Sequence, residues 1–412
     1  MSKVNNIAIV WESETGGGVN SHLRYLLQSK SFLNKKITIF TNSENKGAKL
    51  LIKDLAEQKN IKFIFFSSFF VFDRKRIFFE KLIYYFLKPI FLIFAIFKFK
   101  KILSNSNFDV LLCECGNYGI FRSEQAVILA AKNLKIPVKI MVVHHKCLKP
   151  PLFMGFVFKI IDHLLSKTLT SLISVSRATE KTLLNNSNLL KNGQLKSYVI
   201  HNGVPINEFS RKDYLKLNIA NDEIKEAILR IGMLSRISPD KGHDHLISAF
   251  SRMPSKHQKK MTMVIIGEDE KEQKERLKKL VQKLKLENKI KFLDYVDIDS
   301  KKIILSLDLL VSLTKTYEGF GLSVAEAMSV GTPILATNVG GINEFFNNEC
   351  GKLIEPEKIE DIKNSLVDFC EKKNSWEIKA NFAKNKIEKY FNADIMGSNY
   401  MNHFDSQLKK IK

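Results

Sequence analysis

The stretch EGFGLSVAEAMSVGTPILAT, at residues 318–337, decides the fold. It places carboxylates on Glu318 and Glu326, eight positions apart, with Gly319 and Gly321 directly behind the first. A glycine-flanked loop that runs into a helix can bring backbone N–H groups close to the oxygen atoms of a ligand. Because eight residues are slightly more than two helical turns, both carboxylates can face one cleft. The stretch therefore suits a ligand that is rich in hydroxyl groups.

Strand-like and helix-like runs alternate along the whole chain on both sides of this stretch. Such alternation is typical of parallel α/β architecture, in which helices cover the faces of a sheet. Because 412 residues are more than one domain with a single hydrophobic core usually contains, two Rossmann-like α/β domains are expected. Strands are expected near residues 5–11, 36–40, 61–66, 109–115, 138–145, 171–176, 197–203, 227–234, 261–267, 290–296, 307–314, 333–337 and 351–355.

The boundary between the domains is expected just after His201–Val204, where the strand–helix pattern starts again. We predict one domain over residues 1–205, a second over residues 206–385, and a helix over residues 386–412 that crosses back to the first. The chain runs directly into a strand, so no signal peptide is expected. Its five scattered cysteines include no C-x-x-C pair and indicate reduced thiols in a cytosolic protein.

Positive charge is concentrated in the first half of the chain. The formal net charge is +22, and most of the excess lies in residues 1–205. A Lys-rich composition alone would not load one half so heavily. We therefore expect this half to meet an anionic partner, which is a membrane surface, a lipid phosphate or a nucleic acid.

Residues 63–99 are unusually rich in Phe. The uncharged stretch Pro89–Phe97 is far shorter than the ~20 apolar residues that span a bilayer. Two interpretations stay open: a core helix, or an interfacial segment whose aromatic side meets a membrane. In the second interpretation, the cations that face anionic headgroups are Arg74, Lys75, Arg76, Lys98, Lys100 and Lys101.

Residues 318–337 resemble the retaining glycosyltransferases of family 4, which share the two-domain GT-B fold. The family pattern is a Glu, seven residues, a second Glu, then Ala-Met and a Gly-x-Pro turn. The matching residues here are Glu318, Glu326, Ala327, Met328, Gly331 and Pro333. The segment Gly232–Gly242, with Arg236 and Lys241, and the loop Gly16-Gly17-Gly18 resemble further family segments in the expected order. The resemblance covers most of the chain, and it implies two Rossmann-like domains that face each other across a cleft.

The resemblance implies transfer of a hexose from a nucleoside-diphosphate sugar to an acceptor hydroxyl, with retention at the anomeric carbon. Two cations after a strand of an α/β domain can clamp a diphosphate, although Arg and Lys are more often plain surface residues. The implied catalytic residues are Arg236, Lys241, Glu318 and His144. The implied substrate-binding residues are Gly17, Gly18, Gly319, Phe320, Gly321, Leu322, Ser323 and Glu326, with Glu318 on the sugar and Glu326 on the nucleotide ribose.

His144 and His145 end the strand expected near residues 138–145. The family places a His that lines the cleft here, so His144 is favoured and His145 is the alternate. The D-x-D match at Asp297 and Asp299 is attributed to chance, as is common for short motifs. Because fixed cations already supply positive charge, neither a metal ion nor any other cofactor is expected.

Three alternatives remain. A sugar-nucleotide epimerase or a phosphorylase would share the fold, and a basic nucleic-acid-binding protein would share the charge. The sequence shows no zinc finger, recognition-helix signature or RNA-binding aromatic motif. The favoured setting is bacterial surface polysaccharide assembly (lipopolysaccharide, O-antigen or capsule) on a glycan or lipid-linked acceptor. The protein is expected in the cytoplasm, with peripheral contact to the anionic inner membrane surface.

Overall fold

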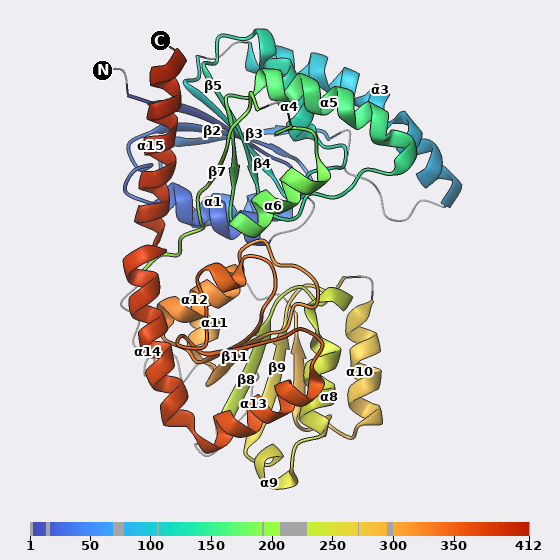
Figure 1. Cartoon of the computed structure of the whole chain (residues 1–412), viewed down its shortest axis with the longest axis vertical. Coiled ribbons are helices and arrows are strands. Elements are labelled where there is room, and N and C mark those ends of the chain that lie inside the picture. Colours follow the sequence, from blue (N-terminus) through green and yellow to red (C-terminus); the bar gives the residue numbers. More distant parts are fainter. Residues whose placement is uncertain are drawn as a thin grey trace. The chain divides into compact units, whose positions relative to one another are not determined.

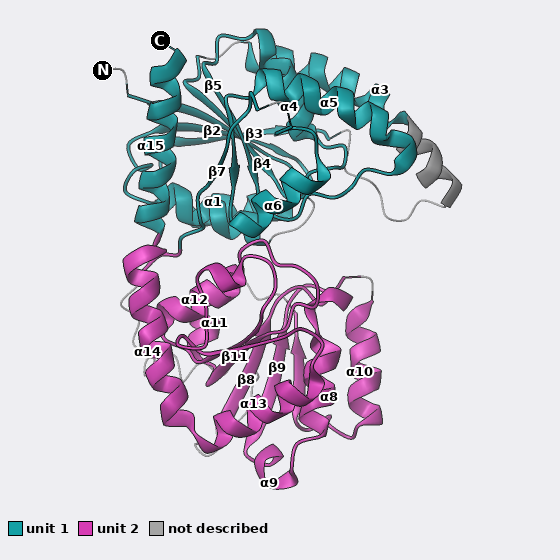
Figure 2. Cartoon of the chain, viewed as in Figure 1, with its two compact units in different colours: residues 1–203, 393–412 teal, residues 204–392 magenta. Residues whose placement is uncertain are grey.

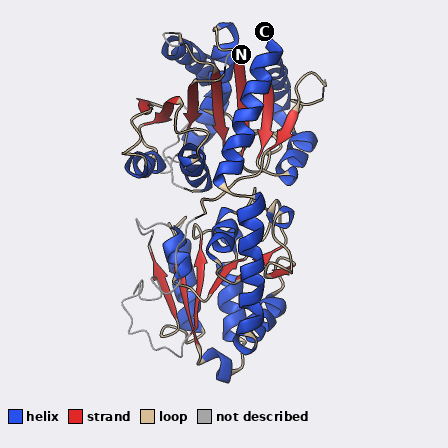
Figure 3. Cartoon of the chain, turned by 90° about the vertical axis from the view of Figure 1, so that its left-hand side faces the viewer, coloured by secondary structure: helices blue, strands red, loops and turns tan. Residues whose placement is uncertain are grey.

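The computed structural model describes residues 3–13, 17–68, 78–104, 107–191, 193–206, 229–270, 272–294 and 300–411, with the backbone alone for 78–86. The chain divides into two compact units (Figure 2). Unit 1 comprises Met1–Gly203 and Ala393–Lys412, and unit 2 comprises Val204–Asn392. Each unit contains one parallel sheet flanked by helices (Figures 1 and 3), so the expected α/β fold class is confirmed.

Unit 1 is built on a seven-stranded sheet with the order β3-β2-β1-β4-β5-β6-β7. Neighbouring strands of this sheet run parallel, and Ile9 of β1 lies opposite Ile39 of β2 and Leu112 of β4. The order reverses beside β1, as in doubly wound folds, whose ligands bind at such a switch point. The strands are β1 (Asn6–Trp11), β2 (Lys36–Asn42), β3 (Ile61–Phe66), β4 (Val110–Cys115), β5 (Val138–Val143), β6 (Ser171–Ser174) and β7 (Ser197–Val199).

The helices of unit 1 form two layers. α4 contacts both α3 and α5, whereas α1 contacts α2 and α15. The bounds are α1 (Gly18–Gln28), α2 (Lys46–Asp54), α3 (Phe78–Leu103), α4 (Ser123–Ala130), η1 (Ala131–Asn133), η2 (Leu152–Met154), α5 (Gly155–Thr168), α6 (Arg177–Asn186) and α15 (Ala393–Ile411).

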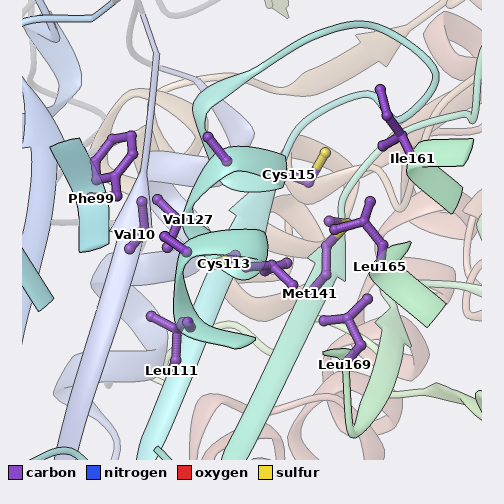
Figure 4. Close-up of a cluster of buried hydrophobic side chains, with 14 of the residues drawn as sticks. Val10, Phe99, Leu111, Cys113, Cys115, Val127, Met141, Ile161, Leu165 and Leu169 are labelled. Carbon is purple, nitrogen blue, oxygen red and sulfur yellow. The ribbon is translucent and has the colours of Figure 1, made fainter. Parts of the chain in front are cut away.

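The core beneath α3, α4 and α5 explains why the strands read as continuous apolar runs. Leu111, Cys113 and Cys115 alternate along β4 and belong to the same buried cluster as Val127 of α4 and Leu165 of α5 (Figure 4). The intervening β4 residues are buried as well. A parallel sheet that is covered on both faces needs apolar residues at nearly every position, so such strands are easily recognised in the sequence.

Helix α15 packs on the other layer of unit 1. Its Phe404 ring lies 6.3 Å from the ring of Phe32, and its Asp405 accepts a hydrogen bond of 3.0 Å from the backbone N–H of Val4. Gly397 faces Ser29 so closely that a Cβ would lie 2.1 Å from the Ser29 hydroxyl oxygen. The last helix of the chain is thus part of the core of unit 1.

Unit 2 has a six-stranded sheet with the order β10-β9-β8-β11-β12-β13, and its neighbouring strands again run parallel. Its strands are β8 (Leu229–Leu234), β9 (Met261–Ile266), β10 (Ile290–Leu293), β11 (Leu309–Ser312), β12 (Ile334–Thr337) and β13 (Lys352–Ile354). Its helices are η3 (Pro239–Lys241), α8 (His243–Ser251), α9 (Ser255–Gln258), α10 (Gln273–Lys283), α11 (Ser300–Leu305), α12 (Leu322–Val330), η4 (Ile342–Glu344), α13 (Ile359–Glu371) and α14 (Lys373–Tyr390).

All the strand ranges expected from the sequence contain a strand in the described part of the chain. A side-chain cap begins α6, where the Ser176 hydroxyl accepts a hydrogen bond of 3.1 Å from the Thr179 N–H. Among the described residues, no helix combines the length and apolar character needed to cross a bilayer.

Candidate functional site

The loop from β11 to α12 carries Glu318 and is held in shape by glycines. Gly321 caps α12 with φ 100°, a left-handed conformation that favours glycine. Gly340 has φ 58°, and a Cβ there would lie 1.9 Å from the Glu318 carbonyl oxygen. The neighbouring Gly341 N–H donates a hydrogen bond of 2.9 Å to that oxygen. The turn after β12 therefore fixes the backbone of Glu318.

Lys241 and Glu318 come together at the carboxyl ends of β8 and β11. The Lys241 Nζ lies 2.6 Å from Glu318 Oε2, and the Thr314 hydroxyl donates a hydrogen bond of 3.1 Å to the same oxygen. Both charged side chains are largely shielded, at 12% and 22% exposure. Gly242, with φ 80°, ends the turn that presents Lys241, and a Cβ there would lie 2.3 Å from the Leu313 carbonyl oxygen. The structure thus places a fixed cation beside a fixed carboxylate.

Arg236 follows β8 and is more exposed than Lys241. Its guanidinium lies 3.1 Å from Glu270 Oε2, and its side chain is 48% exposed. The backbone beside it is tightly packed, because a Cβ on Gly267 would lie 1.8 Å from the Ser235 carbonyl oxygen. Packing therefore fixes the backbone next to Arg236, whereas its half-exposed guanidinium can turn towards a ligand.

Helix α12 contributes its N-terminus and Glu326. Gly321, Leu322 and Ser323 lie at the start of the helix, where N–H groups have no partner within the helix and attract anions, and Gly319 lies two residues before the cap. Glu326 is only 3% exposed. The Phe320 ring is also buried and stacks on Phe345 with centroids 4.4 Å apart, so any ligand contact of Phe320 must involve its backbone.

In unit 1, the glycine loop precedes α1. Gly17 is the N-cap of this helix and Gly18 is its first residue. A Cβ added at Gly17 would meet no atom within 4 Å, so the space beside the helix start is open. Gly16 lies outside the described residues.

His144, the expected catalytic histidine, belongs to a buried cluster in unit 1. Its Nε2 lies 2.5 Å from Glu114 Oε2, and the ring of His22 lies 4.6 Å from its own ring. His22 Nδ1 lies 2.9 Å from the Asn202 side-chain oxygen, so Nδ1 carries the hydrogen and the Nε2 lone pair faces Glu114 at 3.9 Å. The alternate residue, His145, instead contacts the Asn117 side-chain nitrogen at 3.1 Å.

Burial disfavours the charged form of each group in this cluster. It lowers the pKa of His22 to about 4 and that of His144 to about 3, and it raises the pKa of Glu114 to about 7. One proton shared between Glu114 and His144 satisfies both groups at neutral pH. Glu114 thereby fixes the orientation and the tautomer of His144.

The same three side chains are candidate metal ligands, since their ligand atoms lie within 4.8 Å of one another. Ligands at about 2 Å from a tetrahedral ion stand about 3.3 Å apart. His144 and Glu114 are closer than that, at 2.5 Å. The cluster as it stands therefore fits a shared proton better than an ion.

The low pKa of His22 predicts a specific pH dependence. His22 binds a proton below pH 6.5 in the unfolded chain, but only below about pH 4 in the folded protein. The free energy of unfolding therefore decreases as pH falls from 6.5 to about 4. Glu114 opposes this trend, since its raised pKa lowers stability as pH rises from 4.5 to about 7. Relative to the parent, a His22→Gln variant should therefore gain about 3 kcal/mol in unfolding free energy between pH 7 and pH 4.

Denaturant unfolding of the parent and of His22→Gln across this pH range measures the difference between their unfolding free energies. Because both proteins contain Glu114, its contribution largely cancels in this difference. A His163→Gln variant, in which an exposed histidine of α5 is replaced, serves as the control for loss of a histidine. A difference between His22→Gln and the parent that does not change with pH would contradict the buried neutral state of His22.

Sequence reasoning missed several partners. Glu114 and His22 around His144, and Thr314 beside Glu318, are tertiary neighbours with no local signature. Asp297 and Asp299 of the D-x-D match lie outside the described residues.

Comparison with known proteins agrees with this geometry. Residues 218–389 match the family model of glycosyl transferases group 1. The chain is 30% identical over 158 residues to MJ1607, an uncharacterized glycosyltransferase of Methanocaldococcus jannaschii. This alignment covers 37% of this chain and 38% of the relative. It is 25% identical over 224 residues to the O-antigen biosynthesis glycosyltransferase WclY of Escherichia coli, which covers 52% and 57%. The matches thus span less than two thirds of these relatives.

A structural match extends over nearly the whole chain. The crystal structure of Anabaena Alr3699/HepE in complex with UDP and glucose aligns with a TM-score of 0.74 at 19% identity, covering 98% of this chain and 100% of that one. At such low identity the match establishes the fold alone. The family match shows that residues 218–389 belong to the glycosyl transferases group 1, family 4, and the structural match shows that the chain has the GT-B fold.

Proposed function

We propose that the protein is a retaining, metal-independent hexosyltransferase that uses a nucleoside-diphosphate sugar. The observation that carries this proposal is the pair formed by Lys241 and Glu318, 2.6 Å apart beside the N-terminus of α12. A diphosphate leaving group needs fixed positive charge, and a hexose needs acceptors for its hydroxyl groups. Lys241 supplies the positive charge and Glu318 supplies the acceptor, and both side chains are largely shielded from solvent.

In the proposed reaction, the bond between the anomeric carbon and the diphosphate oxygen breaks, and the acceptor oxygen bonds to that carbon on the same face. The acceptor proton passes to the departing phosphate oxygen, so no separate protein base is needed. Lys241 and Arg236, with N–H groups from Gly319 to Leu322, stabilise the charge on the diphosphate. Glu318 binds the sugar hydroxyls, and Glu326 holds the nucleotide ribose.

Unit 1 has the acceptor role in this proposal, and unit 2 binds the donor. His144, held by Glu114 at 2.5 Å, supports the transition state or the donor sugar with a neutral imidazole. Gly17 leaves open space for a substrate group beside Gly18, the first residue of α1. In this proposal, the tautomer that Glu114 fixes determines whether the other ring nitrogen of His144 donates or accepts a hydrogen bond.

The relatives suggest the donor and the setting. Alr3699/HepE was crystallised with UDP and glucose, and WclY is named for O-antigen biosynthesis. We therefore propose a UDP-hexose as the donor, and a glycan or lipid-linked acceptor in bacterial surface polysaccharide assembly. The enzyme would work in the cytoplasm, at the inner face of the membrane.

A thermal-shift panel of UDP-, GDP- and ADP-hexoses tests the donor. At a hundredfold excess over Kd, a ligand stabilises the folded state by about 2.7 kcal/mol, which raises Tm by a few degrees. UDP-hexoses should give this shift in the parent and a much smaller one in Glu326→Gln. If no nucleotide sugar raises Tm, or if Glu326→Gln responds like the parent, the assigned donor site is wrong.

A further inference from the structure

The outward side of α3 is apolar, although it faces solvent. Its exposed positions recur every three or four residues, as one face of a helix requires. They are Leu87, Ile90, Ile93, Phe94 and Phe97, with exposed fractions between 37% and 67%. The opposite side of the helix, with Leu92, Ala95 and Phe99, is buried in the core of unit 1. An ordinary surface helix would carry polar residues on its outer face.

Helix α5 and the short helix η2 before it repeat this pattern. Leu152 is 100% exposed, and Phe153, Phe156 and Ile160 are 60%, 73% and 46% exposed. α3 and α5 both contact α4 and share one core cluster, so they belong to the same layer (Figure 1). The exposed apolar residues of α3, η2 and α5 are together called the aromatic face below.

The charges around the aromatic face have one sign. The segments 87–104 and 149–168 carry Lys98, Lys100, Lys101, Lys149, Lys159 and Lys167 at accessible or partly accessible positions. Asp162, the single acidic residue of these two segments, points inward and accepts hydrogen bonds from Tyr118 at 2.5 Å and from the Asn188 N–H at 2.6 Å. Aromatic residues rimmed by lysines are complementary to a surface that is apolar inside and anionic outside.

We propose that the aromatic face docks this protein on an anionic lipid bilayer. The Phe side chains enter the headgroup region, and the lysines meet lipid phosphates. A second copy of the chain is a poorer partner, because it would bring two lysine-rimmed surfaces together. This inference deepens the proposed function, since it identifies the surface through which the enzyme would reach a lipid-linked acceptor. The protein would lie on the membrane and not cross it.

Co-sedimentation of the full chain with vesicles tests the proposal. Binding is expected to phosphatidylcholine vesicles that contain phosphatidylglycerol, to weaken with added salt, and to be slight with phosphatidylcholine alone. The double variant Phe94→Ser/Phe97→Ser should bind at least about tenfold more weakly, because two exposed aromatic anchors are lost. Both parent residues are more than half exposed, so the fold should tolerate the change.

A matched control lies on α14 in unit 2. Ile378 and Phe382 are 70% and 48% exposed, and Ile378→Ser/Phe382→Ser should bind vesicles like the parent. The proposal is overturned if the two double variants bind equally, or if the parent binds neutral and anionic vesicles alike. A change in oligomeric state of the Phe94→Ser/Phe97→Ser variant by light scattering, with vesicle binding unchanged, would assign the face to a second copy instead.

The test separates this inference from the proposed function. Vesicle binding needs no donor, and the donor thermal shift needs no membrane. Loss of vesicle binding in the variant with an intact UDP-hexose shift supports both. Vesicle binding by a parent that responds to no nucleotide sugar supports the docking surface and removes the proposed function.

Discussion

A Lys241→Ala variant is expected to lose about 100- to 1000-fold in kcat/KM for sugar transfer. The side chain is mostly shielded, and its ammonium is held 2.6 Å from Glu318 Oε2. In the proposed reaction, its removal deletes a preorganised cation where charge develops on the leaving diphosphate. It also leaves the Glu318 carboxylate without that counter-charge, next to a negatively charged donor. Steady-state kinetics with a UDP-hexose and a hydroxyl acceptor measure the loss.

Two further variants show whether the effect is specific. Lys373 forms a similar, partly buried pair with Asp308 at 3.0 Å elsewhere in unit 2, so Lys373→Ala should leave kcat/KM nearly unchanged. Arg236→Ala should also reduce turnover by orders of magnitude, provided that its half-exposed guanidinium turns from Glu270 to the diphosphate. A Lys241→Ala enzyme that works within twofold of the parent would refute the assigned role.

A Gly340→Ala variant is expected to combine strong destabilisation of unit 2 with loss of most activity. The added Cβ would lie 1.9 Å from the carbonyl oxygen and 2.8 Å from the nitrogen of Glu318, at a backbone φ of 58°. Backbone cannot yield as a flexible side chain does, so the Glu318 loop must move and the 2.9 Å bond from Gly341 N–H is lost. We expect a destabilisation of ~3 kcal/mol or more, measured by denaturant unfolding.

Gly331→Ala is the matched control for this variant. Gly331 is also left-handed, at φ 72°, but a Cβ there would meet its nearest atoms at 3.8 Å and 4.0 Å. It should therefore show only the conformational penalty, about 1 kcal/mol, and retain activity. Equal effects of the two substitutions would mean that the close approach to Glu318 has no consequence.

Much of the fold could be predicted because its signals are local. A strand such as β4, buried on both faces, appears in the sequence as an apolar run that Glu114 alone interrupts. Lys241 and Glu318, which the family pattern suggested, also lie together in space. Their partner Thr314 was missed, although it precedes Glu318 by only four residues, because a single Thr in a loop has no distinctive pattern.

The histidine cluster could not be predicted for a different reason. His22 comes from α1, Glu114 from β4 and His144 from the end of β5, so only the tertiary structure brings them together. Residues 63–99 are a third case. Composition left a core helix and an interfacial segment as alternatives, whereas α3 buries one side and exposes apolar residues on the other. A helix that is apolar all round gives no sign in its sequence of which side the core covers.

The position of α15 determines the order in which the units can mature on the ribosome. Residues 204–392 are contiguous and emerge as one piece, whereas the first unit needs Tyr400 and Phe404, which are fully buried within it. A nascent chain can therefore complete the later-encoded unit first. Until translation reaches α15, the earlier sheet lacks a covering helix and exposes apolar surface that chaperones recognise.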